Sequence, residues 1–362
     1  MQNFSESLRQ VIEQRSTLSR EAAAAWMHEI LADQQNLLPD TQIAALLAAL
    51  AVRGVTAEEL AGFVDAMRAA AIPLSLTEAE RAELVDTCGT GGDASGSFNI
   101  STAAALVAAA AGGRDGAGAA MMVAKHGNRA VTSQCGSADV LEALGIPVAL
   151  NPAQAAEAMR RHRFAFLHAP SLHPAMKAVM PVRRALGVRT VFNVLGPLTN
   201  PAGARAQLMG VYAAHLVPIV AEAMRLLGVR HSFVVHGATA NGKGLDELSI
   251  SGPSQLAEVR GDTISFLEIT PEQVGLATAD IESLRGGDAA ANATILRAIF
   301  SGERSPRRDV VLLNAAAVLI TAGAVASATD TRASLRAGIA LAAEAIDSGA
   351  VATLVASLAT GN

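Results

Sequence analysis

The sequence predicts an α/β protein in which a small N-terminal helical domain accompanies a large α/β domain, with a central, mainly parallel sheet covered by helices. Three observations support this fold class. The 362 residues correspond to about two domains of ordinary size. Helical patterns with short turns fill residues 1 to about 73. From Glu83 onward, short β-type runs alternate with helical segments, which is typical of parallel strands flanked by helices.

Composition and charge exclude several classes of protein. Hydrophobic residues make up 51% of the chain and charged residues 17%, which indicates a folded core and not a disordered chain. The formal net charge is −5 and no stripe of Lys and Arg is sustained, so we expect no nucleic-acid partner. The N-terminus lacks the apolar run of a signal peptide, and a cytoplasmic enzyme is therefore expected.

The two cysteines indicate neither a disulfide nor a metal site. Cys88 and Cys135 are far apart and form no C-x-x-C pair, so we predict neither a disulfide scaffold nor a zinc site. Cys88 stands beside a glycine loop, where a reactive thiol is conceivable. We interpret it as a small buried residue.

The elements are marked by local signals. Thr56 and Glu59 form the pattern of a capping box at a helix start. A second helix start is predicted at Asn151, as the N-cap, followed by Pro152 at the first helical position. Helices are expected to stop at Gly145, Gly228, Gly302 and Gly349. The predicted strands are residues 83–87, 121–125, 147–150, 164–168, 207–212 and 232–237, followed by an antiparallel hairpin across 254–269.

One long apolar segment tests the cytoplasmic assignment. Residues 310–329 carry no charge over about the length that a membrane helix requires. Asn314, Thr321, Gly323 and many alanines argue against a span, so we predict a buried core helix and no membrane partner.

A basic segment lies in mid-chain. Residues 173–195 have a largely helical pattern and include Lys177, Arg183, Arg184 and Arg189 but no acid, which by charge alone indicates a solvated helix face. The turn-rich stretch that follows could serve as a hinge between domains.

The residues from Asp86 to Thr102 form a strand, a glycine loop and a helix start, an arrangement that favours an anion. Gly89, Gly91 and Ala94 also fit the dinucleotide pattern G-x-G-x-x-A, but the acidic residue expected about 20 positions later on a strand is missing. Asp93 would repel a phosphate unless it binds ribose hydroxyls or supports a divalent cation. We therefore expect further oxygen ligands elsewhere in the chain.

Those ligands are predicted in GLDELS, where Asp246 and Glu247 follow a strand and a loop. Magnesium commonly takes one or two carboxylates together with substrate oxygens and water. The position after a strand is one where α/β enzymes often place ligands.

A third loop, from Val123 to Ser133, carries Lys125, His126 and Arg129 as cationic donors. Such a cluster can neutralise a leaving phosphate without an acid–base step. Hydroxyl groups follow at Thr132, Ser133 and Ser137, and Ser137 is also expected to cap the next helix. Neither G-x-S-x-G nor H-E-x-x-H occurs, so the inventory indicates transfer from a phosphorylated donor.

These motifs together resemble one family. GTGGD, FNIST, KHGNR, GSADVLEALG, FNVLGPLTNP and GLDE, in this order, are similar to anthranilate phosphoribosyltransferases of tryptophan biosynthesis, over nearly the whole chain. The resemblance implies a homodimer whose fold is shared with pyrimidine nucleoside phosphorylases. It places a helical domain at 1–75, completed by about 171–195, and a catalytic domain at 80–170 and 196–362. It also implies Mg²⁺, with two ions per subunit.

The implied reaction transfers the phosphoribosyl group of 5-phosphoribosyl-1-diphosphate to the amino group of anthranilate and releases pyrophosphate. Lys125, His126 and Arg183 would be catalytic. Ser101, Asp246 and Glu247 match the magnesium ligands, and Gly89, Asn128 and Arg183 match the anthranilate contacts. The implied donor contacts are Gly89, Gly92, Asp93, Ser97, Asn99, Ile100, Ser101, Thr102, Lys125, His126, Gly127, Asn128, Arg129, Ala130, Val131, Thr132, Ser133 and Ser137.

Two departures from the family pattern are lengthened loops near 112–122 and 237–244, which leave the motifs intact. The alternatives are a pyrimidine nucleoside phosphorylase on the same fold and a non-catalytic relative that binds nucleic acid. Asn128 and Arg183 beside a complete magnesium set disfavour the first. The acidic net charge disfavours the second.

Overall fold

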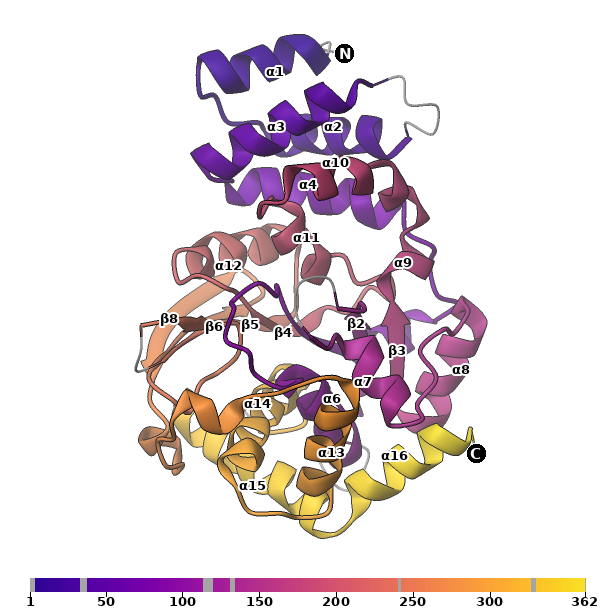
Figure 1. Ribbon diagram of the computed structural model, residues 1–362, viewed down its shortest axis with the longest axis vertical. Helices are drawn as coiled ribbons and strands as arrows, with labels where there is room; N and C mark the ends of the chain where they lie inside the picture. The colour runs from indigo at the N-terminus through magenta and orange to yellow at the C-terminus, as the bar shows by residue number, and fades with distance from the viewer. Residues whose placement is uncertain are drawn as a thin grey trace.

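The computed structural model describes residues 4–32, 38–112, 120–130, 134–239, 242–326 and 330–361. A helical domain stands above a larger α/β domain (Figure 1). Its N-terminal helices are α1 (Phe4–Glu13), α2 (Arg20–Ala32), α3 (Asp40–Arg53) and α4 (Ala57–Ala69). The predicted capping box is confirmed, since Thr56 Oγ1 accepts from the Glu59 N–H and the Glu59 carboxylate accepts from the Thr56 N–H.

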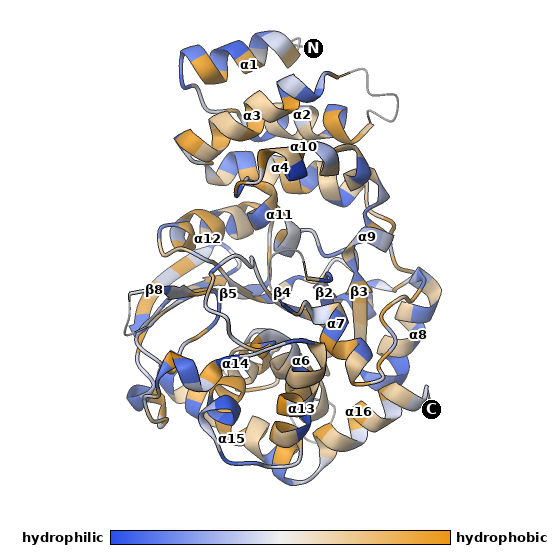
Figure 2. Cartoon of the chain, viewed as in Figure 1, coloured by the Kyte–Doolittle hydropathy of each residue, from blue (hydrophilic) through white to orange (hydrophobic). Residues whose placement is uncertain are grey.

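The helical domain is amphipathic and shares a core with the mid-chain segment. Figure 2 shows hydrophilic and hydrophobic bands alternating along α1, whose Phe4, Leu8 and Val11 are buried. The mid-chain elements are α9 (Ala169–Leu172), η1 (Pro174–Ala178), α10 (Met180–Leu186) and α11 (Phe192–Leu198). Residues of η1, α10 and α11 join the hydrophobic cluster of α1 to α4. The helical pattern predicted for 173–195 is therefore confirmed, while the domain boundaries themselves stay a prediction.

The central sheet has the strand order β3-β2-β1-β4-β5-β7-β8. Its parallel strands are β1 (Leu84–Gly89), β2 (Met122–Gly127), β3 (Phe164–His168), β4 (Ala206–Gly210) and β5 (His231–Ala238). Antiparallel to β5 run β6 (Gly244–Leu245) and β7 (Ser254–Arg260), and β7 forms the predicted hairpin with β8 (Thr263–Ile269).

The strand predicted at 147–150 is wrong. These residues lie in no strand, although Val148 is buried in the hydrophobic cluster that also includes residues of α6 (Ile100–Gly112) and α14 (Pro306–Ala322). Pro147 has no N–H to give to a ladder. The apolar run there reflects burial of an extended segment without sheet pairing.

Helices cover both faces of the sheet. On one face lie α6, α7 (Ser137–Ala143), α13 (Ala289–Phe300), α14, α15 (Thr331–Asp347) and α16 (Ala350–Thr360). The other face is covered by α8 (Pro152–His162), α12 (Leu216–Leu226) and the helical domain. The short helix α5 (Glu78–Ala82) precedes β1, and the short turns η2 (Glu272–Val274) and η3 (Ile281–Leu284) follow β8. The helix stops predicted at Gly145, Gly228, Gly302 and Gly349 are confirmed, all with positive φ.

The long apolar segment forms the core helix α14, in which every residue from Val310 to Ala322 is buried. Residues 327–329 of that segment lie outside the described residues. Within the described ranges, no single helix is long and apolar enough to cross a membrane; α15 and α16 pass such a test only as a pair bent by 62°.

Candidate functional site

Three predicted loops meet at the carboxyl ends of the parallel strands. β1 leads into the donor loop, defined as residues 89–99, and β2 leads into the loop that begins at Gly127. The hairpin of β5 and β6 delivers Asp246 and Glu247 to the same place. The Gly91 N–H donates to Asp246 Oδ2 at 2.7 Å, and the Ser101 N–H donates to Glu247 Oε1 at 3.0 Å. Residues 155 and 146 positions apart are thereby brought together.

Glycines at three strand ends make room for the acidic pair. A Cβ at Gly89 would lie 2.2 Å from Asp246 Oδ2, and one at Gly210 would lie 1.6 Å from the Asp246 carbonyl oxygen. A Cβ at Gly237 would lie 2.6 Å from the Glu247 carbonyl oxygen. The segment of Asp246 and Glu247 therefore crosses the ends of β1, β4 and β5 against bare backbone.

Three carboxylates converge at this crossing. Asp93 Oδ1 accepts from the Ser95 N–H at 3.1 Å, and Asp93 Oδ2 accepts from the Asp246 N–H at 3.3 Å. Burial and then the charge of Asp93 raise the pKa of Asp246 well above its ordinary value, and burial raises the pKa of Glu247 to about 7. A site of this kind favours a cation, because a positive charge would offset the repulsion among the carboxylates.

The oxygen ligands of this site fit a magnesium ion that is bound partly by the protein and partly by substrate. Among the described residues, no group of three or more His, Cys, Asp or Glu side chains forms a ready-made metal cage. Two carboxylates and the hydroxyl of Ser101, completed by substrate oxygens and water, form the kind of oxygen site that Mg²⁺ commonly occupies.

Lys125 lies beneath this site. Its side chain is only 1% exposed, and Nζ donates to the Thr87 carbonyl at 2.8 Å and to Ser101 Oγ at 3.3 Å. Its charge acts on Glu247, whose pKa it lowers against the larger effect of burial. The ammonium thus stabilises the negative charge of Glu247.

Sequence reasoning missed the buried acid that organises the end of β2. Asp86 is 1% exposed, and its Oδ1 accepts from the His126 N–H at 3.1 Å. Burial raises the pKa of Asp86, against the opposing effects of Asn200 and Lys125. A charged residue inside an otherwise apolar strand was the signal available for it.

The imidazole of His126 is buried and neutral. Its ring centroid lies 5.2 Å from that of His173, and burial together with His173 lowers the pKa of His126 to about 3. The Nε2 atoms of both rings have no hydrogen-bond partner among the described residues. The ring of His126 therefore carries no charge near neutral pH, which differs from the cationic donor expected from the sequence.

Arg129 turns away from the acidic pair. Its guanidinium donates to Glu142 at 2.6 and 2.7 Å and to Asp139 at 3.2 Å, both on α7. Ser137 Oγ donates to the Asn128 carbonyl at 3.3 Å. The expected cap at Ser137 is wrong: Gly136 is the N-cap, because the Asp139 carboxylate accepts from the Gly136 N–H at 2.8 Å.

Most of the remaining residues expected to contact the donor are buried or bonded to other parts of the protein. Asn99 is held by Asn292 and by the Cys135 carbonyl, and Ile100 and Thr102 are buried in α6. Ser97 Oγ accepts from Ser95 Oγ at 3.1 Å. Ala130 donates its N–H to Asp139, while Val131, Thr132 and Ser133 lie outside the described residues.

Of two arginines in the mid-chain segment, Arg189 contacts the donor loop, whereas the described contacts of Arg183 lie within the segment itself. Arg189, for which no role was predicted, donates to the Gly92 carbonyl at 2.6 Å and lies over the Tyr212 ring at 4.6 Å. Arg183 lies over the Phe192 ring at 5.1 Å, and burial lowers its pKa. No contact of Arg183 with Gly89 or Asn128 is among those described.

Cys88 has the structural role expected of it. It is 9% exposed, its Sγ accepts from Gln207 Nε2 at 3.3 Å, and burial raises the pKa of its thiol.

Comparison with known proteins decides the family. Residues 81–352 match the α/β domain of a glycosyl transferase family, and residues 5–71 match its helical bundle domain. An anthranilate phosphoribosyltransferase of Brevibacillus brevis is 49% identical over 92% of this chain and 91% of its own. The chain belongs to the anthranilate phosphoribosyltransferase family.

Solved structures of this family share the whole architecture. The crystal structure of the Thermus thermophilus anthranilate phosphoribosyltransferase has a TM-score of 0.84 and 41% identity, and it covers 98% of both chains. The Saccharomyces cerevisiae enzyme, solved in complex with PRPP and Mg, has a TM-score of 0.83 and 26% identity and covers 99% of this chain and 98% of its own.

Proposed function

We propose that the chain transfers the phosphoribosyl group of 5-phosphoribosyl-1-diphosphate to the amino group of anthranilate and releases pyrophosphate. The observation that carries this proposal is the crossing of Asp246 and Glu247 over the ends of β1, β4 and β5, against the donor loop. A phosphorylated donor and its counter-ion need an oxygen-rich cation site next to free backbone N–H groups. The 49% identity to an anthranilate phosphoribosyltransferase over 92% of this chain supports the assignment.

The donor and magnesium would share the acidic crossing. Ser101, Asp246 and Glu247 are proposed as the magnesium ligands, with two ions per subunit. When bound, magnesium would offset the charge of the diphosphate. The proposed donor contacts are Gly89, Gly92, Asp93, Ser97, Asn99, Ile100, Ser101, Thr102 and the residues from Lys125 to Ser133, with Ser137.

The reaction breaks the bond between C1 of the ribose and the diphosphate oxygen, which keeps the electron pair. The anthranilate nitrogen supplies the pair for the new C1–N bond and then loses a proton to solvent. Lys125 acts by holding Ser101 and the acidic pair in place, since its Nζ is bonded to Ser101 Oγ and the Thr87 carbonyl. Catalysis in this arrangement relies on orientation and charge stabilisation.

The acceptor would approach from the side of the mid-chain segment. Arg183 is half-buried on α10 and provides a cation for the anthranilate carboxylate. Gly89 and Asn128 are proposed as further contacts, and His126 would line the same path with a neutral ring.

The assignment is tested with the purified chain by following anthranilate fluorescence. We expect fluorescence to fall only when 5-phosphoribosyl-1-diphosphate and Mg²⁺ are both supplied. Removal of the metal with a chelator should stop the decay, and excess Mg²⁺ should restore it. Unchanged fluorescence beside an active control enzyme would sink the assignment.

We further propose a cytoplasmic homodimer. Two apolar side chains of the helical domain are exposed to solvent, Ile12 of α1 with an exposed fraction of 49% and Val52 of α3 with 91%. They support the proposal that a second copy of the chain covers this surface. Light scattering on the purified chain tests this directly, since a mass of 37.0 kDa would indicate a monomer.

A further inference from the structure

Arg189 joins the mid-chain segment to the donor loop. Its Nη2 donates to the Gly92 carbonyl at 2.6 Å, between residues that are 97 positions apart in the sequence. A Cβ on Gly92 would lie 3.4 Å from Arg189 Nε, so the guanidinium lies directly against the loop backbone. Gly92 is a proposed donor contact, whereas Arg189 has no role in the proposed function.

The guanidinium of Arg189 is oriented by Tyr212. It lies over the Tyr212 ring at 4.6 Å, and the ring face attracts the cation. The Tyr212 N–H donates to Thr90 Oγ1 at 3.0 Å, and the Thr90 N–H donates to the Gly210 carbonyl at 3.0 Å. Tyr212 therefore contacts both Arg189 and the start of the donor loop, and it limits the positions of an otherwise exposed arginine.

The backbone at Arg189 is fixed by the residues that follow it. Thr190 is 5% exposed, and its N–H donates to Asn193 Oδ1 at 3.0 Å. Val191 belongs to the hydrophobic cluster that includes α1 to α4. Arg189 therefore reaches the donor loop from a rigid base.

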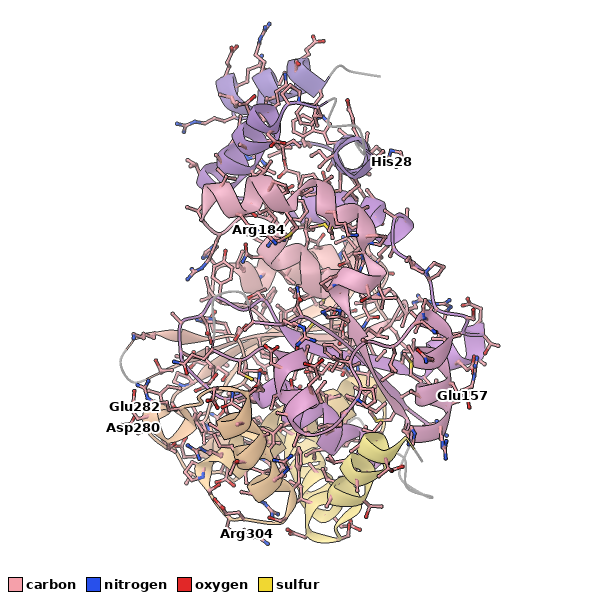
Figure 3. The ribbon with its side chains drawn as sticks, turned by 45° about the vertical axis from the view of Figure 1, so that its right-hand side comes forward. His28, Glu157, Arg184, Asp280, Glu282 and Arg304 are labelled. Atoms are coloured by element: carbon pink, nitrogen blue, oxygen red, sulfur yellow. The ribbon has the colours of Figure 1, made fainter. Side chains whose placement is uncertain are left out.

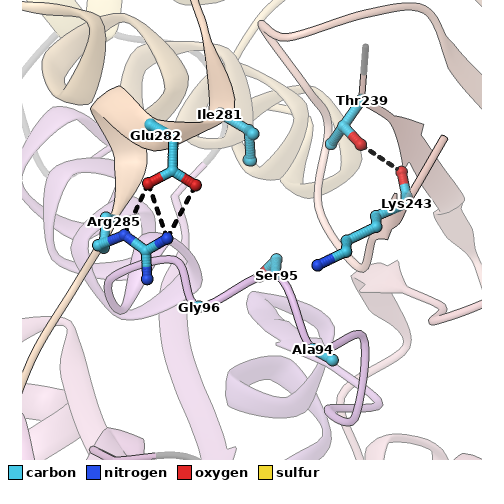
Figure 4. Close-up of a pocket in the computed structure, with 8 residues that line it drawn as sticks. All are labelled: Ala94, Ser95, Gly96, Thr239, Lys243, Ile281, Glu282 and Arg285. Atoms are coloured by element: carbon cyan, nitrogen blue, oxygen red, sulfur yellow. Dashed lines mark hydrogen bonds and ion pairs between the residues drawn. The ribbon is translucent and has the colours of Figure 1, made fainter. Parts of the chain in front are cut away.

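The middle of the donor loop is not packed against the wall that faces it. Figure 4 shows residues 94–96 beside a hollow that Thr239 and Lys243 line from the β5–β6 hairpin. The volume of this hollow, about 140 Å³, is several times the roughly 30 Å³ that one water occupies in the liquid. Four residues of the loop also have a positive φ, a region that side chains rarely adopt: Gly91, Gly92, Ala94 and Gly96. The position of the loop therefore depends on its anchors, of which Gly92 is one.

Fixing the Gly92 carbonyl also fixes the N–H of Asp93. The peptide group is planar and no cis bond occurs within the described ranges, so the two groups point in opposite directions. The Asp93 N–H thus points away from Arg189, and it donates to no protein group among the described residues. A backbone donor that is oriented before its ligand arrives costs no reorganisation on binding.

We propose that Arg189 is a positioning residue, which holds the Gly92–Asp93 peptide in the orientation that binds the phosphorylated donor. The proposal rests on the proposed function for the identity of that ligand. It gives the mid-chain segment a part in both halves of the reaction, because the segment also carries Arg183, the proposed cation for the acceptor.

The first measurement is hydrogen–deuterium exchange of the free, full-length chain, followed by mass spectrometry. We expect the amides of residues 89–99 to exchange about 3- to 10-fold faster in Arg189→Ala. Arg189→Lys keeps a charged donor and should recover part of the protection. Tyr212→Leu removes the ring but keeps the backbone N–H, so it should also speed exchange. Arg184→Ala is the matched control, because it removes an exposed arginine from the same segment, and it should leave exchange unchanged.

The second measurement is calorimetry of 5-phosphoribosyl-1-diphosphate binding, with excess Mg²⁺ and no anthranilate. Arg189→Ala should weaken donor binding about 3- to 10-fold, with partial recovery in Arg189→Lys. The KM for anthranilate, from initial rates at saturating donor, should stay unchanged. A purely structural role would instead lower the free energy of unfolding and leave the donor affinity as it is.

Equal donor affinities of Arg189→Ala and Arg184→Ala would overturn the proposal. Weaker donor binding with unchanged exchange would also overturn it, because Arg189 would then act on the donor directly. If the unmodified chain binds no donor, the proposed function fails and the exchange measurement decides alone: faster exchange in Arg189→Ala supports positioning, and equal exchange refutes it.

Discussion

At the scale of single residues, burial divides the basic side chains near the site into two groups. Lys125 is enclosed and bonded to Thr87 and Ser101, so its charge acts on protein groups. Arg183 is half-buried over Phe192, whereas its neighbour Arg184 is exposed. Only a charge that is partly desolvated yet reachable gains strongly from an incoming carboxylate.

We therefore expect Arg183→Ala to raise the KM for anthranilate about 10-fold, equivalent to about 1.4 kcal/mol, with little change in the KM for the donor. Arg183→Lys should recover part of the loss, because it keeps the charge without the planar fork. Initial rates at varied anthranilate and fixed donor provide the measurement. Arg184→Ala, labelled in Figure 3, is the control and should behave like the unmodified chain. Equal effects of the two alanine variants would contradict the distinction.

Whether a site residue could be recognised in the sequence depends on whether its contacts are local or long-range. Asp93, Asp246 and Glu247 could be predicted because each stands in a short motif whose chemistry is visible locally. Asp86 and Arg189 were missed, because their roles depend on contacts with β2 and the donor loop from distant parts of the chain; for Asp86, the charge inside a β-type run was the one signal in the sequence. The bonds of Asp93 to two backbone N–H groups were likewise invisible in the sequence.

At the scale of elements, the site is built by strand ends that lack side chains. Gly89 and Gly210 are directly paired in the parallel ladder of β1 and β4, and both face the segment of Asp246. The glycines are required by close approach, since a Cβ at either position would overlap that segment.

Gly210→Ala should displace Asp246, because the added Cβ would lie 1.6 Å from its carbonyl oxygen. We expect at least a 10-fold rise in the Mg²⁺ concentration needed for half-maximal activity, with a loss of about 1 to 3 kcal/mol in the free energy of unfolding. Titrating activity with Mg²⁺ and unfolding the variant with denaturant measure the two effects. Met209→Leu, at the preceding and buried position, conserves volume and should leave the Mg²⁺ dependence intact. Unaltered Mg²⁺ dependence in Gly210→Ala would refute the role of the crossing.

Helices and strands were predicted correctly where their hydrogen-bond partners are close in sequence. The capping box at Thr56 and the hairpin of β7 and β8 depend on neighbours in sequence, and both are present. Residues 147–150 have the same apolar pattern as a strand, but the pattern records burial and not the hydrogen-bond partner. Pairing is a long-range property that this stretch lacks.

At the scale of the whole molecule, the sheet separates the largest of three hydrophobic cores from the other two, which lie on its opposite face. One core lies among α6, α13, α14, α15 and α16, a second joins α12 to the helical domain, and a smaller third packs α8 against β2 and β3. Alternation of strands and helices predicts a mainly parallel sheet, but the order β3-β2-β1-β4-β5 depends on where each crossover helix packs. That order is what brings the ends of β1, β4 and β5 under the acidic pair.

Glu258 connects this sheet to a C-terminal helix. Its Oε1 accepts from His231 Nε2 on β5 at 2.9 Å and from Arg260 Nε on β7 at 2.5 Å. Its Oε2 accepts from Thr331 Oγ1 on α15 at 3.1 Å. The side chain is only 8% exposed, so these bonds are shielded from solvent.

Acid should weaken the whole fold partly through Glu258. Burial alone would raise its pKa, but the bonds from His231 and Arg260 prevail and lower the pKa to about 2 from an ordinary 4.5. Since the folded state holds the proton less tightly than the unfolded chain, the stabilisation is complete above about pH 4.5 and is lost as the pH falls toward 2.

Glu258→Gln should cost about 2 kcal/mol at pH 7 and flatten the pH dependence of the unfolding free energy in this window. Denaturant unfolding at several pH values measures both effects. Glu157→Gln, on the surface of α8 (Figure 3), is the control and should preserve the stability and slope of the unmodified chain. A Glu258→Gln variant with an unchanged slope would show that this carboxylate does not connect the sheet to α15 energetically.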